Sequence, residues 1–306
     1  MHGHAGSRRR FIAGLACATL WPWARAAQMP AQLLQRRIPS GGEVLPVIGL
    51  GTWQAFDFGH DTRARTEAAE ALGAFIDAGA RVIDSSPMYG QAEAVVGDLL
   101  AQTEGSNEVF VATKVWTRGR DAGKQQIAES FRHLRREQLD LLQVHNLLDV
   151  QTQLPTLREL KAADKVRYIG ITHYAASAHA EMQGLIDAGG IDFIQINYSL
   201  LEREAAARLL PAAAAKGVAV VINRPFAEGA VFARTRGKTL PAIAAEYGCT
   251  SWAQLALKFI LAQAAVTVVI PGTRNVHHLT DNLAGGSGPM PDAAGAKRIA
   301  AAFDAL

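Results

Sequence analysis

Short apolar runs recur along the chain, and segments with helical spacing separate them. Eight of these runs have the length and the Val, Ile and Leu content of buried strands. The predicted strands are Val47 to Leu50, Arg81 to Asp84, Val109 to Lys114, Leu141 to His145, Tyr168 to Thr172, Phe193 to Asn197, Val218 to Asn223 and Val266 to Ile270. Apolar strands that alternate with helices favour parallel pairing with right-handed crossovers. The pattern therefore predicts an α/β fold, a (β/α)8 TIM barrel.

The intervening segments carry the expected helix signals. Predicted helices are Thr66 to Ala78, Ala92 to Leu100, Lys124 to Arg135, Pro155 to Ala163, Ala176 to Asp187 and Glu202 to Lys216. Ahead of the barrel, two extended pieces from Arg37 to Leu45 surround a Gly-Gly turn and predict an N-terminal β-hairpin. An open doubly wound sheet is the alternative. It is disfavoured because Gly49 to Gln54 lacks the third glycine of a dinucleotide-binding turn.

The first 26 residues follow a different pattern. Three arginines at positions 8 to 10 precede a mostly apolar stretch from Ala13 to Trp23, and Ala24-Arg25-Ala26 has the small residues that a signal peptidase reads. We interpret residues 1–26 as a twin-arginine signal peptide and residues 27–306 as the barrel domain. The alternatives are a basic N-terminal arm or a membrane anchor, although the apolar run is shorter than the ~20 residues that span a bilayer.

This interpretation predicts the twin-arginine translocase as a partner and a periplasmic or secreted protein without a stable membrane anchor. Translation from Met29 would instead give a cytoplasmic form. Removing residues 1–26 takes away four arginines and no acid, so the formal net charge changes from +3 to −1. No basic stripe then remains to recommend a nucleic-acid partner. Cys249 would be the only cysteine left, which excludes an internal disulfide.

Polar side chains stand at the ends of three consecutive predicted strands. They are Asp84, Lys114 and His145, and Tyr89 follows five residues after Asp84. Parallel strands bring such ends to one rim of a barrel. A lysine beside a phenol favours the ionised form and makes the phenol a better acid, while a histidine can orient a carbonyl. The group suits protonation of an oxygen that is becoming an alkoxide, and it contains no evident nucleophile or metal ligand.

Seven motifs, in order along the chain, resemble the aldo-keto reductase superfamily. They are Gly49 to Trp53, Asp84 to Gly90 with Glu93 and Gly97, Thr113-Lys114, Asp140 to His145, Ile169 to Thr172, Gln195 to Tyr198 and Ile270 to Arg274. The resemblance implies NAD(P)H-dependent reduction of a small-molecule aldehyde or ketone, with Tyr89 as general acid. Lys114 and Asp84 would lower the pKa of Tyr89, and His145 would orient the carbonyl.

The resemblance also implies residues that would bind the cofactor. Thr172, His173 and Gln195 would hold the nicotinamide, and Arg224 or Phe226 would stack on it where relatives have a tyrosine. The remaining predicted contacts lie after the eighth strand and on the short helix expected from Val276 to Asn282: Gly272, Thr273, Arg274, His278 and Asn282. Arg274 is the clamp left for the extra phosphate, so NADP(H) is expected in preference to NAD(H).

Two further residues would face the substrate, namely Trp53 and Asn146. Because the chain ends soon after its last helix, we expect an open pocket with broad specificity. A non-catalytic NADP-binding regulatory or redox-sensing protein is the alternative function, since His173 and Asn223 depart from the family pattern. A glycosidase that uses Asp84 and Glu93 is disfavoured because it leaves Tyr89 and Lys114 without a role. An exported reductase would also need a redox partner to recharge its cofactor.

Overall fold

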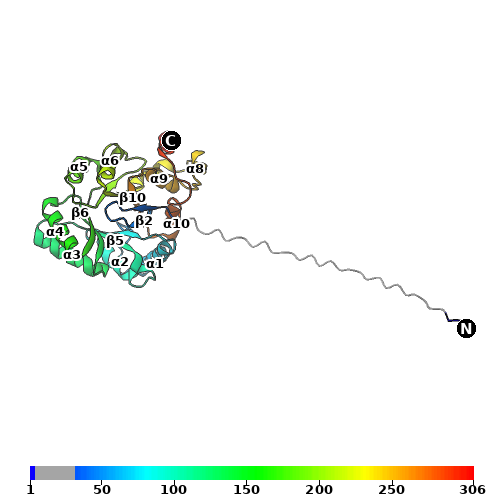
Figure 1. Ribbon diagram of the computed structural model, residues 1–306, viewed down its shortest axis with the longest axis horizontal. Coiled ribbons are helices and arrows are strands. Elements are labelled where there is room, and N and C mark those ends of the chain that lie inside the picture. The colour runs from blue at the N-terminus through cyan, green and yellow to red at the C-terminus, as the bar shows by residue number, and fades with distance from the viewer. Residues whose placement is uncertain (4–31) are drawn as a thin grey trace. The chain divides into compact units, whose positions relative to one another are not determined.

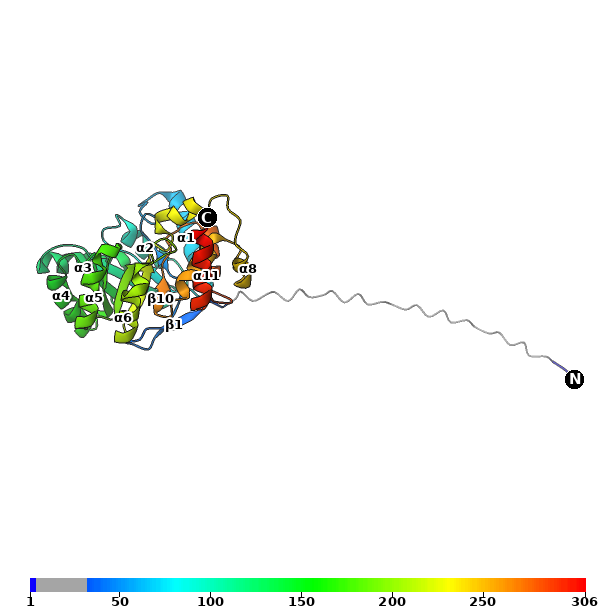
Figure 2. The ribbon, with the colours of Figure 1, turned by 90° about the horizontal axis from the view of Figure 1, so that it is seen from above.

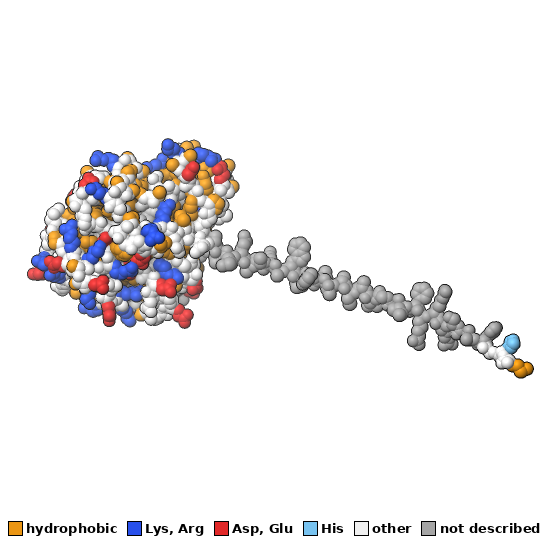
Figure 3. Space-filling model, viewed as in Figure 1, with side chains coloured by type: hydrophobic (Ala, Val, Ile, Leu, Met, Phe, Trp, Pro, Cys, Tyr) orange, Lys and Arg blue, Asp and Glu red, His pale blue; other side chains and the backbone are white. Residues whose placement is uncertain are grey.

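The computed structural model describes residues 1–3 and 32–306. The predicted signal peptide and Met29 lie outside the described residues, apart from residues 1–3, so the signal stays a prediction. In the described part of the chain, no helix combines the length and the apolar character that crossing a membrane requires. Acidic and basic side chains are mixed over the face of the barrel domain that Figure 3 shows.

Eight parallel strands form the wall of a barrel, and helices surround it (Figures 1 and 2). The strands pair in chain order: β3 (Leu50–Gly51), β4 (Val82–Asp84), β5 (Phe110–Val115), β6 (Leu139–His145), β7 (Val166–Thr172), β8 (Phe193–Asn197), β9 (Ala219–Asn223) and β10 (Val266–Val269). Two isolated parallel bridges, Ile48 to Val269 and Gly51 to Gly272, join the first strand to the last. The predicted (β/α)8 barrel is confirmed.

The α-helices lie between the strands, as the pattern predicted, except for the last two, which follow the final strand. They are α1 (Thr62–Asp77), α2 (Ala92–Leu100), α3 (Arg120–Leu134), α4 (Val150–Ala162), α5 (His179–Ala188), α6 (Leu209–Lys216), α7 (Ala230–Thr235), α8 (Ile243–Glu246), α9 (Trp252–Leu261), α10 (Val276–Ala284) and α11 (Ala293–Asp304). Short 3-10 turns complete the set: η1 (Ser106–Glu108), η2 (Ala176–Ala178), η3 (Glu204–Ala207) and η4 (Ala227–Gly229).

Some predicted helix boundaries were wrong. Helix α4 begins at Val150 and contains Pro155 rather than starting there. The segment expected as one helix from Glu202 to Lys216 is a 3-10 turn followed by α6, because Arg208 between them has the non-helical φ of −139°. Hydrophobic spacing continues across such a break, so it does not reveal one.

The predicted hairpin, β1 (Gln35–Arg37) and β2 (Val44–Pro46), is confirmed and contributes to the barrel core. Ile38 and Leu45 next to its turn belong to the same buried cluster as Phe110, Tyr168 and Phe193, which stand near the starts of β5, β7 and β8. The hairpin therefore packs against the N-terminal end of the barrel. The opposite end, where the strands finish, carries the polar residues of the predicted site.

Glycine is required where the barrel closes. A Cβ atom on Gly51 would lie 2.9 Å from the backbone oxygen of Ile270, which is closer than real Cβ contacts allow. Gly272 pairs with Gly51 across the same contact. The backbones of β3 and the segment after β10 can approach each other because neither carries a side chain here.

Candidate active site

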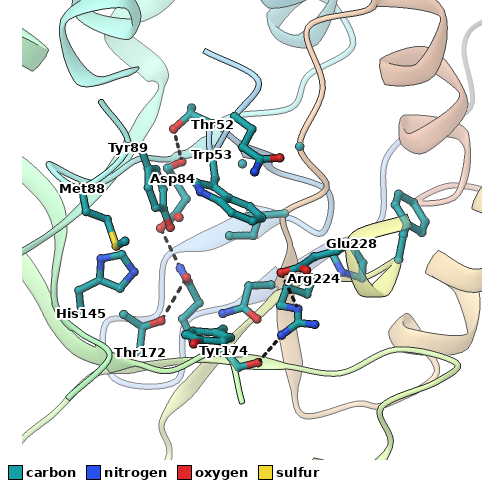
Figure 4. Close-up of a pocket in the computed structure, with 18 of the residues that line it drawn as sticks. Thr52, Trp53, Asp84, Met88, Tyr89, His145, Thr172, Tyr174, Arg224 and Glu228 are labelled. Carbon is teal, nitrogen blue, oxygen red and sulfur yellow. Dashed lines mark hydrogen bonds and ion pairs between the residues drawn. The ribbon is translucent and has the colours of Figure 1, made fainter. Parts of the chain in front are cut away.

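Three of the four residues singled out from the sequence, Asp84, Tyr89 and His145, line one cavity at the C-terminal rim of the barrel (Figure 4). The fourth, Lys114, is buried beside them. Lys114 Nζ lies 2.5 Å from Asp84 Oδ2 and 5.0 Å from the centroid of the Tyr89 ring. The rings of Tyr89 and His145 meet edge to face, with centroids 5.6 Å apart. Asp84, Lys114 and His145 share a rim because they stand at the ends of neighbouring strands. Asp84 is the last residue of β4, His145 is the last residue of β6, and Lys114 is the last but one of β5.

Asp84 accepts hydrogen bonds from more groups than the sequence indicated. Besides Lys114, the amides of Gln195 and Gln143 donate to Asp84 Oδ1, at 2.8 and 3.4 Å. Lys114 also donates to the backbone oxygen of Ser85 at 2.6 Å. Gln143 was not predicted as a site residue, although its alternation with Leu142 and Val144 on β6 already indicated that its side chain points into the barrel.

The charge state of the buried pair follows from competing effects. Burial alone disfavours a charged lysine, but the nearby Asp84 and Tyr89 raise the pKa of Lys114 above its ordinary value. For Tyr89, burial is the larger effect and raises the pKa of the phenol, while Lys114 opposes this shift. The expected net lowering of the Tyr89 pKa was therefore wrong in direction. The phenol keeps its proton at neutral pH, which a proton donor requires.

His145 is neutral. Burial lowers its pKa to about 2, and the charge of Lys114 and the neighbouring His173 act in the same direction. Its Nδ1 atom lies 2.8 Å from the hydroxyl oxygen of Ser86, a residue that sequence reasoning placed in a motif but gave no role. A neutral imidazole has one donor and one acceptor nitrogen, so His145 can donate a single hydrogen bond towards the cavity.

A cavity of about 550 Å³ opens beside these residues. Apolar and aromatic side chains around it include Trp53, Met88, Tyr174 and Phe232, all of which are partly exposed to solvent. Seven of the residues predicted to bind cofactor or substrate also line this cavity: Trp53, Asn146, Thr172, Gln195, Arg224, Phe226 and Gly272. Five predicted cofactor residues are not part of this lining: His173, Thr273, Arg274, His278 and Asn282. Within the described residues, no cluster of three His, Cys, Asp or Glu could hold a metal ion.

The family model described as "Aldo/keto reductase family" matches residues 47–297. The chain belongs to this family. The Bacillus subtilis aldo-keto reductase YhdN is 30% identical over 54% of this chain, and the match covers 53% of that protein. The Escherichia coli methylglyoxal reductase YeaE is 27% identical over 82% of this chain and 89% of its own length. An aldo-keto reductase from Klebsiella pneumoniae, solved in complex with NADPH, has the same fold, with a TM-score of 0.72, 23% identity and coverage of 89% of this chain and 96% of that one.

The cavity of this aldo-keto reductase contains polar atoms that suit the carboxamide of a nicotinamide. The side-chain oxygens of Asn146 and Asn223 are buried and have no hydrogen-bond partner among the described residues. Buried polar atoms in proteins are usually paired, so such atoms in a cavity indicate a ligand with donor groups. Thr172 and Gln195, which share a hydrogen bond of 3.2 Å, lie in the same lining. These residues fit the nicotinamide end of the cofactor.

The start of α10 has an internal cap. The Asn275 side chain accepts hydrogen bonds from the backbone N–H groups of His277 and His278, at 2.9 and 3.1 Å. A phosphate at this helix terminus would compete with that cap for the same donors. Arg274, the predicted phosphate clamp, lies 3.3 Å from the Glu67 carboxylate and over the ring of Phe58. Asn282 is buried within α10.

Arg224 is already paired in this structure. Its guanidinium lies 3.5 Å from Glu228 and donates to the backbone oxygen of Tyr174 at 3.2 Å (Figure 4). It also lies 3.5 Å from Glu202. Its backbone adopts a left-handed conformation, with φ of 48°. Arg224 thus connects the loops that follow β7, β8 and β9. Phe226 packs on Phe232, with ring centroids 4.7 Å apart.

Proposed function

We propose that the protein reduces an aldehyde or ketone to an alcohol with NAD(P)H, and that Tyr89 is the general acid. The observation that carries this proposal is the buried contact of Tyr89 with a charged Lys114 and a neutral His145. The bound cofactor would supply a hydride to the carbonyl carbon. The protein side chains account for the other half of the reaction, which is protonation of the carbonyl oxygen.

Each side chain has a distinct task in this step. Tyr89 holds its proton until negative charge develops on the substrate oxygen, and Lys114 beside the ring then stabilises the phenolate that forms. Asp84 holds the Lys114 ammonium in place, and the amides of Gln143 and Gln195 donate to Asp84 in turn. Because His145 is neutral, it can position the carbonyl by a hydrogen bond without competing as an acid.

The test is the variant Tyr89→Phe, assayed by oxidation of NADPH with a panel of aldehydes, ketones and quinones. Loss of a general acid lowers rates by about 10²- to 10⁴-fold, and we expect kcat to fall in this range. Tyr198→Phe is a matched control, since Tyr198 is also buried but bonds Gln263 outside the cavity lining. Tight binding of NADP(H) without turnover of any carbonyl by the unmodified protein would favour the alternative, a regulatory or redox-sensing binding protein.

We further propose that NADP(H) is preferred over NAD(H). Arg274 supports this preference because a guanidinium at the start of α10 can pair with the extra phosphate, provided that it leaves Glu67. The structure from Klebsiella pneumoniae contains NADPH, whereas another relative is named an NADH-specific methylglyoxal reductase. Calorimetric titration with both cofactors should show that Arg274→Ala weakens NADPH binding by about tenfold or more and leaves NADH binding unchanged. Equal effects on both would contradict the proposal.

We propose that the chain is exported through the twin-arginine pathway, on the strength of the arginines at positions 8 to 10 and the apolar stretch after them. Export would carry a folded, cofactor-loaded protein, and a redox partner would then have to reduce the retained cofactor. Cell fractionation with N-terminal sequencing tests this. A mature N-terminus near Ala27 in the periplasmic fraction is expected, and a cytoplasmic chain that retains residues 1–26 would contradict export.

A further inference from the structure

The hydroxyl of Ser86 contacts His145 from outside the cavity. Ser86 is fully buried and does not line the cavity, whereas the His145 ring does (Figure 4). The Ser86 oxygen lies 2.8 Å from His145 Nδ1. It also accepts a hydrogen bond of 3.3 Å from the backbone N–H of Met88, two residues later, in a local turn. These are the two partners of the hydroxyl among the described residues.

The two contacts determine which way the hydrogen bond to His145 runs. A serine hydroxyl has one proton to donate, and buried hydroxyl protons are normally paired. If Nδ1 carried the imidazole proton, Ser86 would accept from both Met88 and His145, and its own proton would have no acceptor. If Ser86 donates to Nδ1 instead, the Ser86 hydroxyl proton, Nδ1 and the N–H of Met88 are all paired. The imidazole proton then resides on Nε2.

We propose that Ser86 is a positioning residue that fixes His145 as the neutral tautomer with the proton on Nε2. This inference rests on the proposed function for its catalytic meaning. An Nε2–H group can donate to a substrate carbonyl, whereas the other tautomer would present a lone pair and repel the carbonyl oxygen. In histidines generally, the hydrogen bond made by one ring nitrogen decides which nitrogen is protonated. Ser86 supplies that bond here.

The tautomer can be observed directly, without turnover. Long-range proton–nitrogen NMR of protein labelled with nitrogen-15 distinguishes a protonated from an unprotonated ring nitrogen. The His145 signals are assigned by their loss in His145→Gln. We expect the unmodified protein to show a protonated Nε2 and an Nδ1 that accepts a hydrogen bond. In Ser86→Ala, the His145 signals should move towards a mixture of the two tautomers.

Ser85→Ala is the matched control. Ser85 is equally buried and also makes one side-chain hydrogen bond, but its hydroxyl contacts Thr52 at 3.0 Å and not His145. The control should keep the Nε2–H tautomer. Ser86→Thr retains the hydroxyl, so this variant should also show the Nε2–H tautomer, in contrast to Ser86→Ala. An Nδ1–H tautomer in the unmodified protein, or an unchanged His145 spectrum in Ser86→Ala, would overturn the inference. The first of these outcomes depends on no substitution of Ser86.

Kinetics gives a second and separate measurement. In Ser86→Ala we expect kcat to fall by about tenfold, which corresponds to ~1.4 kcal/mol. The affinity for NADP(H) should not change, because Ser86 lies outside the cavity lining. If neither the unmodified protein nor any variant reduces a carbonyl while the NMR signals behave as expected, the proposed reductase function fails and the tautomer assignment stands. If reduction occurs but the tautomer of His145 does not depend on Ser86, only the present inference fails.

Discussion

Replacing Lys114 by methionine tests how the buried charge pair contributes to stability. The side chains of Lys114 and Asp84 are 0% and 4% exposed, and Lys114 Nζ lies 2.5 Å from Asp84 Oδ2. At an effective dielectric constant of about 20, two unit charges at this distance attract by roughly 7 kcal/mol. Removing the two ions from water costs several kcal/mol for each ion, and this cost offsets most of the attraction. The net contribution of the intact pair to stability is therefore small. The loss of one partner is different, because it leaves a charge buried alone.

We therefore expect Lys114→Met to lower the free energy of unfolding by about 3–5 kcal/mol. The lower end is favoured because Gln143 and Gln195 still donate to Asp84. The double variant Lys114→Met/Asp84→Asn removes both charges and retains an acceptor for these amides, so it should recover most of the lost stability. Denaturation with guanidinium chloride at pH 7, followed by circular dichroism, measures both. Carbonyl reduction should be strongly reduced in both variants.

The result that refutes this reasoning is a double variant no more stable than Lys114→Met. In that case the destabilisation would come from lost packing around position 114 and not from an uncompensated charge on Asp84. A double variant with full activity would separately contradict the role given to Lys114 beside Tyr89.

Three further outcomes are expected. Burial lowers the pKa of His145 to about 2, so below pH 6.5 the unfolded chain takes up a proton at this residue and the folded chain does not. Between pH 8 and pH 4, the free energy of unfolding, measured by denaturation at each pH, should therefore fall by about 3 kcal/mol more in the unmodified protein than in His145→Gln. Gly51→Ala should destabilise the barrel by about 1–3 kcal/mol, since the new Cβ would meet the Ile270 carbonyl, whereas Gly73→Ala in α1 meets open space and should be neutral or stabilising; thermal unfolding of both decides. Burial raises the pKa of Cys249 to about 11, so in a Cys17→Ser background its thiol should react with a disulfide reagent roughly 100-fold more slowly at pH 8 than in the urea-unfolded chain, and equal rates would count against this.

Strand order made most of the site predictable. Asp84, Lys114 and His145 close consecutive apolar runs, and the parallel barrel brings the ends of such runs together. The cap on α10 was also readable, because an asparagine directly before a helix is a common N-cap and Asn275 stands there. These features depend on local pattern and on topology, which hydrophobic spacing reveals.

Other features depend on distances that a pattern does not contain. Arg274 pairs with Glu67, which is 207 residues away in the sequence. The direction of the Tyr89 pKa shift depends on whether burial or Lys114 has the larger effect, and sequence reasoning considered only the charge. The contact between Ser86 and His145 depends on one side-chain rotamer. Contacts and burial effects of this kind can be identified only from the three-dimensional structure.

The closure between β3 and β10 has a consequence for local unfolding. Six residue pairs join β6 to β7, but isolated bridges and few backbone hydrogen bonds, such as Gly49 N to Val269 O at 2.8 Å, join the first strand to the last. Amide hydrogens along this seam should exchange with solvent before those of the central strands. Gly51 and Gly272, which meet at the seam, both line the cavity. A ligand that contacts both would hold the seam closed, so its binding would appear as slowed exchange in the weakest part of the barrel wall.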